Sequence, residues 1–384
     1  MKIQISKKVD DMAPSGIRAF FDLVLGMKDV ISLGVGEPDF VTPWNIREKA
    51  ITAYEEGYTS YTSNKGLISL RKQIAHFLKH KFDLVYDPET EILITVGVSE
   101  GLDLAWRTLI NPGDKVLVPE PCYVSYAPLA DMAGGRVIRM VTQTKNHFKM
   151  LPAELDQICK KEGIKYLMIN YPSNPTGASY NRKELEALVK VIKKNNVVVI
   201  SDEVYDDLTY DFDHVPLATL PGMKERVIYM NGFSKAYAMT GFRIGFACGP
   251  ENVIAGMTKI HQYTILCAPI NGQMAAEEAL VNGHKSVAAM KTEYKRRRQF
   301  IVDSLNEMGL ECHMPQGAFY AFPSIKKTSM TSIDFAQELL KEQKVALVPG
   351  VAFGPSAEGH VRISYASSFE ALKEAMARVK KFLK

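Results

Sequence analysis

Apolar and amphipathic runs alternate along the chain from about residue 45 onward. In "SLRKQIAHFLKHKF" (69–82) apolar residues recur three and four positions apart, which predicts a helix. The run "EILITV" (91–96) that comes after it is typical of a strand. The same alternation predicts helices at "SEGLDLAWRTLI" and "RKELEALVKVIKKN", and strands at "KVLVPE", "KYLMINYP", "VVVISDEVY" and "RVIYMNGF".

The predicted strands are apolar at successive positions, as in "VVVI", rather than at every second one. This pattern is expected of parallel strands that are covered on both faces. Strands that alternate with helices imply right-handed crossovers and an α/β fold. We therefore predict a large domain over 45–283, with a mainly parallel (mixed) sheet flanked by helices.

The pattern changes after about residue 284, where a long helical run, "SVAAMKTEYKRRRQFIVDSLNEMG", leads to short strands and further helices. These features predict a smaller α+β domain formed by both chain ends, residues 1–44 and 284–384. No Gly/Ser-rich or Pro-rich linker marks the boundary, so we expect one continuous helix to connect the two domains.

Composition narrows the functional class. The 384 residues carry a net charge of +4 without a basic block, which does not favour a nucleic-acid or membrane-surface partner. Five cysteines are scattered, and neither C-x-x-C nor H-E-x-x-H occurs, so we expect no disulfide framework and no metal site. No apolar run approaches the length of a membrane span. These observations predict a soluble cytoplasmic protein.

Polar residues follow four of the predicted strands. In open α/β sheets, ligands bind beyond the carboxyl ends of the strands. We expect one crevice to collect Ser99, Asn174, Asp202, Tyr205, Ser234 and Lys235.

A phosphate group would suit one part of this crevice. Val98, Ser99 and Glu100 begin a helix directly after a strand, so their backbone N–H groups are free to bind an anion. Ser234 offers a hydroxyl and Arg243 a planar guanidinium. Ser99 alone would be an ordinary helix N-cap, but the combination favours phosphate.

The remaining two residues identify a cofactor. Asp202 alone could belong to a structural ion pair. In the crevice, however, it could hold a heterocyclic ring nitrogen in its protonated form. With ~4 Å between carboxylate and nitrogen and an effective dielectric of ~20, the attraction is roughly 4 kcal/mol, or about three pKa units. Lys235 can form a Schiff base with a carbonyl group, although most lysines are merely exposed. A phosphate site, a carboxylate and this lysine together match pyridoxal 5′-phosphate.

The sequence also resembles the class I (fold type I) pyridoxal-phosphate aminotransferases over nearly its whole length. The motifs that carry the resemblance are "SLGVGEPDF", "YTSNKGLISLRKQIA", "YPSNPTG", "SDEVYDDLTY", "NGFSKAYAMTGFRIGF", "GAFYAFP" and "HVRISYA". The resemblance implies that an amino group passes from an L-amino acid to a 2-oxo acid, with glutamate and 2-oxoglutarate as one pair.

The resemblance assigns roles to the cofactor residues. Lys235 would bind the cofactor and move the proton during catalysis, while Asp202 would hold the pyridine nitrogen. Asn174 and Tyr205 would hydrogen-bond the phenolic oxygen, and Tyr123 would stack on the ring. The phosphate would be bound by Ser99, Ser234, Arg243 and the backbone of Val98 and Glu100.

Three further residues gain roles only by resemblance. Arg362 would bind the α-carboxylate of the substrate, Asn174 would contact the substrate as well as the cofactor, and the backbone of Gly36 would approach the substrate closely. Tyr61 would reach the phosphate of the neighbouring subunit, which implies a homodimer with a shared active site.

The physiological substrate stays open at this point. Ser99 stands where one bacterial branch has a cationic residue for a distal carboxylate, and Arg18 is a candidate substitute. "SGIRAFF", "HQYTILCA" and "SMTSIDFA" are similar to a subgroup that acts on N-acetyl-diaminopimelate, and aspartate and aromatic aminotransferases share much of the pattern. A lyase of the same fold is an alternative, and a non-catalytic cofactor-binding sensor is a remote one.

Overall fold

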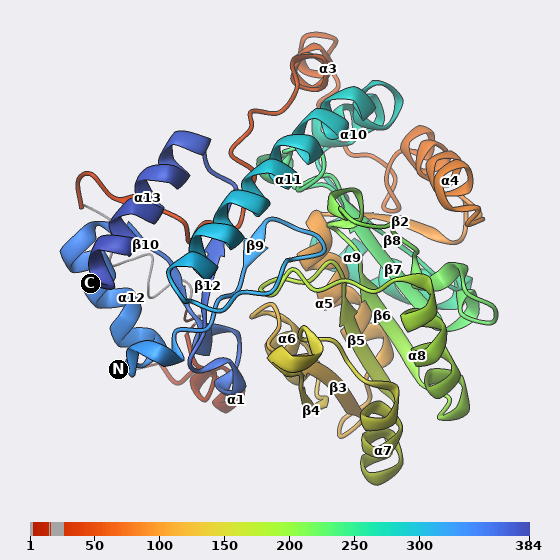
Figure 1. The fold of residues 1–384 in the computed structure, drawn as a ribbon. Coiled ribbons are helices and arrows are strands. Elements are labelled where there is room, and N and C mark those ends of the chain that lie inside the picture. The colour runs from red at the N-terminus through yellow and green to blue at the C-terminus, as the bar shows by residue number, and fades with distance from the viewer. Residues whose placement is uncertain (1–2, 15, 17–26) are drawn as a thin grey trace.

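The computed structural model describes residues 3–14, 16 and 27–384. A seven-stranded sheet with the strand order β2-β8-β7-β6-β5-β3-β4 forms the centre of the larger lobe in Figure 1. Its strands are β2 (Ile92–Thr95), β3 (Lys115–Glu120), β4 (Arg136–Val141), β5 (Tyr166–Asn170), β6 (Val198–Asp202), β7 (Val227–Gly232) and β8 (Gly245–Cys248). Strand β8 runs antiparallel to β2 and β7, and the other neighbouring strands pair in parallel. The prediction of a mainly parallel, mixed sheet is confirmed.

Helices cover both faces of the sheet, as Figure 1 shows. They are α4 (Ile68–Phe82), α5 (Gly97–Leu109), α6 (Tyr126–Met132), α7 (Pro152–Glu162), α8 (Arg182–Lys194), α9 (Glu251–Thr264) and α10 (Ile270–Asn282), whereas α3 (Trp44–Glu55) packs against α10. Successive residues of β5 illustrate the two cores: Met168 packs with Leu102 of α5, whereas Leu167 packs in the cluster that contains Leu188 of α8. Burial on both faces explains why the strands are apolar at successive positions.

Among the described residues, the smaller lobe contains short strands and the three helices α11, α12 and α13. Its elements are β1 (Ile31–Ser32), α11 (His284–Glu307), β9 (Tyr320–Ala321), α12 (Ser332–Gln343), β10 (Val345–Ala346), β11 (Val348–Pro349), β12 (Val361–Ser364) and α13 (Phe369–Phe382). Strand β1 pairs in parallel with β10, and β12 lies antiparallel between β11 and β9. The N-terminal residues of β1 therefore join a lobe built mainly from the C-terminal part of the chain.

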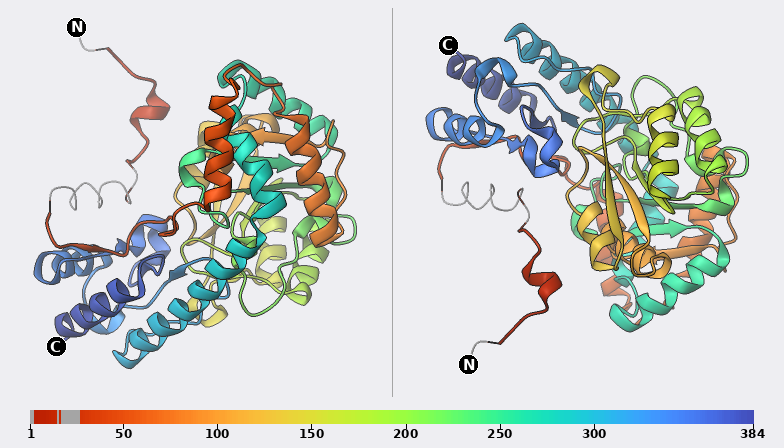
Figure 2. Two further views of the ribbon diagram at one scale, coloured as in Figure 1. Left: turned by 90° about the horizontal axis from the view of Figure 1, so that it is seen from above. Right: turned by 90° about the horizontal axis from the view of Figure 1, so that it is seen from below.

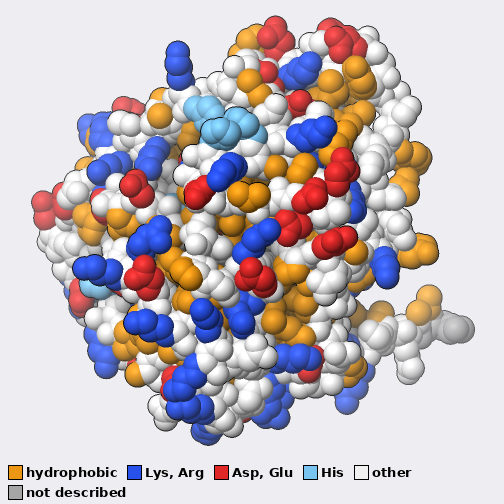
Figure 3. Space-filling view, turned by 90° about the vertical axis from the view of Figure 1, so that its right-hand side faces the viewer, with side chains coloured by type: hydrophobic (Ala, Val, Ile, Leu, Met, Phe, Trp, Pro, Cys, Tyr) orange, Lys and Arg blue, Asp and Glu red, His pale blue; other side chains and the backbone are white. Residues whose placement is uncertain are grey.

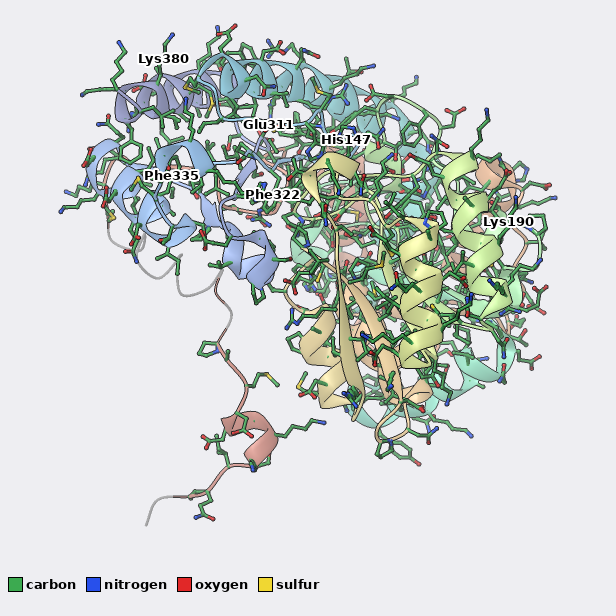
Figure 4. All side chains as sticks on the ribbon, turned by 60° about the horizontal axis from the view of Figure 1, so that its bottom comes forward. His147, Lys190, Glu311, Phe322, Phe335 and Lys380 are labelled. Atoms are coloured by element: carbon green, nitrogen blue, oxygen red, sulfur yellow. The ribbon has the colours of Figure 1, made fainter. Side chains whose placement is uncertain are left out.

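The lobes meet through side chains as well as through the long helix α11. Phe148, in the loop after β4, packs edge-on against Phe322 with ring centroids 5.4 Å apart. Figure 4 labels Phe322 and the neighbouring His147 at this junction. Residues 3–14, which include α1 (Lys7–Asp10), lie apart from both lobes in Figure 2. The domain boundaries themselves stay a prediction.

The face shown in Figure 3 mixes Lys and Arg side chains with Asp and Glu side chains. Within the described part of the chain, none of the helices is both long enough and apolar enough to cross a membrane.

Candidate active site

A cavity of about 830 Å³ lies at the carboxyl ends of the central strands, where an open α/β sheet is expected to bind its ligand. Most of the predicted site residues line it: Gly36, Val98, Ser99, Tyr123, Asn174, Asp202, Tyr205, Ser234, Lys235, Arg243 and Arg362. The predicted convergence of several strand ends on one crevice is therefore observed.

Lys235 follows β7 and projects its amine into this cavity. Its Nζ donates a hydrogen bond of 2.7 Å to the carbonyl oxygen of Gly36, which joins the two lobes across the site. Burial and then the positive charge of Arg362 lower the pKa of Lys235 to about 8, against the opposing effect of Glu37 and Asp202. At pH 7 about a tenth of the amine is thus free of its proton, far more than in an exposed lysine.

Asp202 is the last residue of β6 and is almost completely buried. Its Oδ2 accepts a 2.8 Å hydrogen bond from the hydroxyl of Tyr126. Burial raises the pKa of Asp202 to about 6, although the hydrogen bonds from Tyr126 and from the backbone of Val204 oppose the rise. A buried carboxylate with this pKa would be stabilised by a cationic partner in the cavity.

Arg362 lies on β12, and its side chain is fully buried. One guanidinium nitrogen donates a 2.9 Å hydrogen bond to Oδ1 of Asn174, and another donates to the carbonyl oxygen of Gly34. Its Nε is buried without a hydrogen-bond partner. A Cβ atom at Gly36 would lie 3.7 Å from this guanidinium and only 2.9 Å from the hydroxyl of Tyr320. Arg362 and Gly36 both line the cavity, where a planar anion could lie beside the guanidinium.

The first turn of α5 and the residues around η5 (Thr240–Phe242) form one corner of the cavity, where the predicted phosphate-binding residues lie. Gly97 begins α5 with a φ of +73°, and a Cβ there would lie 2.7 Å from Nη2 of Arg243. Glycine therefore lets the guanidinium approach the start of the helix, where backbone N–H groups are free. Nη1 of Arg243 donates to the carbonyl oxygen of Thr240 at 2.8 Å, which orients the guanidinium. Ser99 and Ser234 line the same cavity.

Three candidates lie outside the cavity lining or outside the described residues. The side chain of Glu100 accepts from the backbone N–H of Val96 and lies 2.7 Å from Nδ1 of His261, so it points away from the cavity. Tyr61 is 82% exposed. Arg18 falls outside the described residues. The roles of all three stay predictions.

The sequence reasoning missed several residues of the site. Tyr126, the first residue of α6, lines the cavity, and its hydroxyl donates a hydrogen bond to Asp202. Its place three residues after Tyr123 was the one local signal that indicated it. Glu37 and Thr240 line the cavity and share a 3.2 Å hydrogen bond. Tyr320 lies behind the lining, with its hydroxyl 2.8 Å from that of Tyr205. Among the described residues, no cluster of three or more His, Cys, Asp or Glu could hold a metal ion.

The chain is similar to proteins of one enzyme class. The family described as "Aminotransferase class I and II" matches residues 28–379. An aspartate aminotransferase of Pyrococcus abyssi is 45% identical, covering 99% of this chain and 98% of its own. Aromatic-amino-acid aminotransferase 2 of Thermococcus litoralis is 42% identical over the same shares of the two chains. The solved structure of aspartate aminotransferase from Thermus thermophilus with maleate superposes with a TM-score of 0.94, is 34% identical, and covers 99% of this chain and 100% of its own.

This chain therefore belongs to the class I and II aminotransferase family. It is a transferase of amino groups that depends on pyridoxal 5′-phosphate. The residues of the cavity fit that cofactor: a buried carboxylate with a raised pKa suits a cationic ring nitrogen, and the corner between Gly97 and Arg243 suits a phosphate.

Proposed function

We propose that Lys235 is the catalytic base of the transamination and the residue that binds the cofactor. The observation that carries this proposal is a single cavity that holds Lys235, with a pKa lowered to about 8, together with Asp202 and Arg362. Bound pyridoxal phosphate supplies a carbonyl group that captures the amino group and a ring that accepts electrons from the substrate. The neutral Nζ of Lys235 removes the proton from Cα of the amino acid.

The surrounding residues hold the cofactor in place. Asp202 would keep the ring nitrogen protonated, and Asn174 and Tyr205 would hydrogen-bond the phenolic oxygen. Tyr123 would stack on the ring. The phosphate would be bound by Ser99, Ser234, Arg243 and the backbone N–H groups of Val98 and Glu100. Support comes from the free N–H groups at the start of α5 and from the closeness of Arg243 to Gly97.

Arg362 would bind the substrate α-carboxylate, with the backbone of Gly36 beside it. A planar guanidinium can hold both oxygens of a carboxylate at once. Support comes from its burial and from its place in the cavity lining, because a buried charge is costly unless an opposite charge pairs with it. The hydrogen bonds to Asn174 and Gly34 fix the orientation of the guanidinium before the substrate binds.

Glutamate and 2-oxoglutarate would be one substrate pair. The second pair would be of the aspartate, aromatic or N-acetyl-diaminopimelate type. Two of these types match the names of the relatives from Pyrococcus abyssi and Thermococcus litoralis.

The active enzyme would be a homodimer in which Tyr61 reaches the phosphate of the neighbouring subunit. Tyr61 is 82% exposed and Tyr263 is 87% exposed. The two segments lie side by side, because Asn64 donates a 2.8 Å hydrogen bond to the carbonyl oxygen of Leu266. Exposed aromatic residues gathered on one face are typical of a protein–protein interface.

Mixed dimers test the role of Tyr61 directly. A hybrid of one Lys235→Ala subunit and one Tyr61→Ala subunit contains one site with both wild-type residues if Tyr61 acts across the interface. That site should bind the cofactor with wild-type affinity. If Tyr61 acts within its own subunit, neither site of the hybrid is intact, and the expected recovery is absent.

The enzyme would work in the cytoplasm. All five cysteines are free thiols in the structure, and three of them are buried. Unpaired cysteines are expected where the environment is reducing.

The variant Lys235→Ala tests the assignment of the catalytic base. We expect turnover to fall by at least ~10³-fold, because a positioned general base alone contributes about 10²–10⁴-fold, and we expect the visible absorption of the bound cofactor to change. Lys291→Ala is a matched control, since burial also lowers the pKa of Lys291 but this residue does not line the cavity. Substantial activity in Lys235→Ala would refute the proposal.

A further inference from the structure

We propose that Tyr320 is a positioning residue that couples the cofactor-tuning phenol of Tyr205 to the carboxylate-binding Arg362. This inference rests on the proposed roles of those two residues. Tyr320 does not line the cavity and would not touch the substrate or the cofactor. It acts through Tyr205, which would touch the cofactor, and Arg362, which would touch the substrate.

Tyr320 contacts both partners with different parts of its side chain. Its hydroxyl oxygen lies 2.8 Å from that of Tyr205, and the two rings meet at 80° with centroids 5.8 Å apart. The guanidinium carbon of Arg362 lies 4.6 Å from the centre of the Tyr320 ring. All three side chains are buried. The ring and the hydroxyl can therefore be tested separately.

The geometry of the strands fixes these contacts. Tyr320 begins β9, which pairs with β12, and its register partner is Ser364, two residues after Arg362. Gly36 approaches from the other side, where a Cβ would lie 2.9 Å from the Tyr320 hydroxyl. The side chain thus has little freedom to turn away from Tyr205.

The direction of the hydrogen bond between the two tyrosines follows from the proton count. A phenol has one proton to donate. When Tyr205 donates its proton to the phenolic oxygen of the cofactor, Tyr320 must be the donor to the oxygen of Tyr205. A hydroxyl that accepts a hydrogen bond becomes a stronger donor, because the bonds in a chain polarise one another. Tyr320 therefore strengthens the hydrogen bond that Tyr205 makes.

This chain of hydrogen bonds has a spectroscopic consequence. A donor to the phenolic oxygen stabilises the negative charge that grows when the bound cofactor loses its proton, and so it lowers the pH midpoint of that step. The midpoint can be read from the visible spectrum as a function of pH. We expect Tyr205→Phe to raise it by about one pH unit or more, and Tyr320→Phe to raise it by about half a unit.

The double variant and a matched control complete the test. Tyr205→Phe/Tyr320→Phe should have the same midpoint as Tyr205→Phe, because Tyr320 acts only through Tyr205. Tyr365→Phe is the control, since Tyr365 is a buried tyrosine whose hydroxyl donates to the carbonyl oxygen of Ala318 at 3.1 Å, and it does not line the cavity. It should lower stability without moving the midpoint.

The contact with Arg362 is tested by steady-state kinetics. Tyr320→Phe keeps the ring, so the KM for the amino acid should stay within about twofold of the wild-type value, whereas Tyr320→Leu should raise it about tenfold. A wild-type midpoint in Tyr320→Phe, or additive shifts in the double variant, would overturn the proposal. If Tyr205→Phe itself leaves the midpoint unchanged, the proposed role of Tyr205 fails, and the inference about Tyr320 falls with it.

Discussion

Replacement of Asp202 by asparagine should stabilise the cofactor-free protein while impairing the enzyme. Burial raises the pKa of this carboxyl from 3.8 to about 6. Because the folded-state pKa is the higher one, the carboxyl contributes stability that is present below the unfolded pKa and is lost as the pH rises through the folded pKa. The loss is nearly complete at about pH 7 and amounts to about 3 kcal/mol. Asparagine does not titrate and avoids this loss.

Urea denaturation of the cofactor-free proteins at pH 5 and pH 7.5 measures the effect. At pH 5 about half of the loss has developed, so the stability of Asp202→Asn relative to wild type should rise by about 1.5 kcal/mol between the two pH values. Tyr126→Phe is the complementary variant, because it removes the 2.8 Å hydrogen bond that favours the ionised carboxylate. It should destabilise the protein more at pH 7.5 than at pH 5. If the stability difference between Asp202→Asn and wild type does not change with pH, the pKa of Asp202 is not raised in the folded protein.

Two further predictions concern the cations of the cavity. Arg362→Lys should raise the KM for the amino acid by about 100-fold, because lysine has no planar guanidinium that can bind both carboxylate oxygens. The control is Arg298→Lys, which alters a buried arginine paired with Asp211 and should change stability but not KM. The rate at which cofactor-free protein captures pyridoxal phosphate should rise about tenfold between pH 7 and pH 9 and then level off, because the pKa of Lys235 is lowered to about 8. A rate that keeps rising tenfold per pH unit above pH 9 would indicate an unperturbed lysine.

Local patterns predicted five strands of the seven-stranded sheet and the ends that face the crevice, but they did not predict β4 (Arg136–Val141) or β8 (Gly245–Cys248). The run "KVLVPE" coincides with β3, Lys115–Glu120, and Asp202 ends β6 as expected of a residue that enters the crevice. Continuous apolar runs are reliable in this chain because both faces of the sheet are covered. The motif around Lys235 and Arg243 needed only short-range spacing, so its residues were found before the fold was known.

The missed residues depend on contacts that no local pattern contains. Tyr320 meets Tyr205 across 115 positions of the chain, and only the packing of the smaller lobe against the sheet brings them together. Tyr126 stands three residues after Tyr123, which indicates a place near the cavity, but its hydrogen bond to Asp202, 76 positions away, cannot be found in the local pattern. For Glu100 the sequence predicted only a backbone contact, which stays a prediction; the contact of its side chain with His261, 161 positions away, was not predicted.

The most direct test of the central claim is the visible spectrum of the cofactor-loaded enzyme before and after the addition of L-glutamate, without any 2-oxo acid. We expect the absorption of bound pyridoxal phosphate to give way to that of pyridoxamine phosphate, with one 2-oxoglutarate released per subunit. An unchanged spectrum would contradict glutamate as a donor. Release of ammonia in place of the stable pyridoxamine form would contradict the exchange of an amino group at this site.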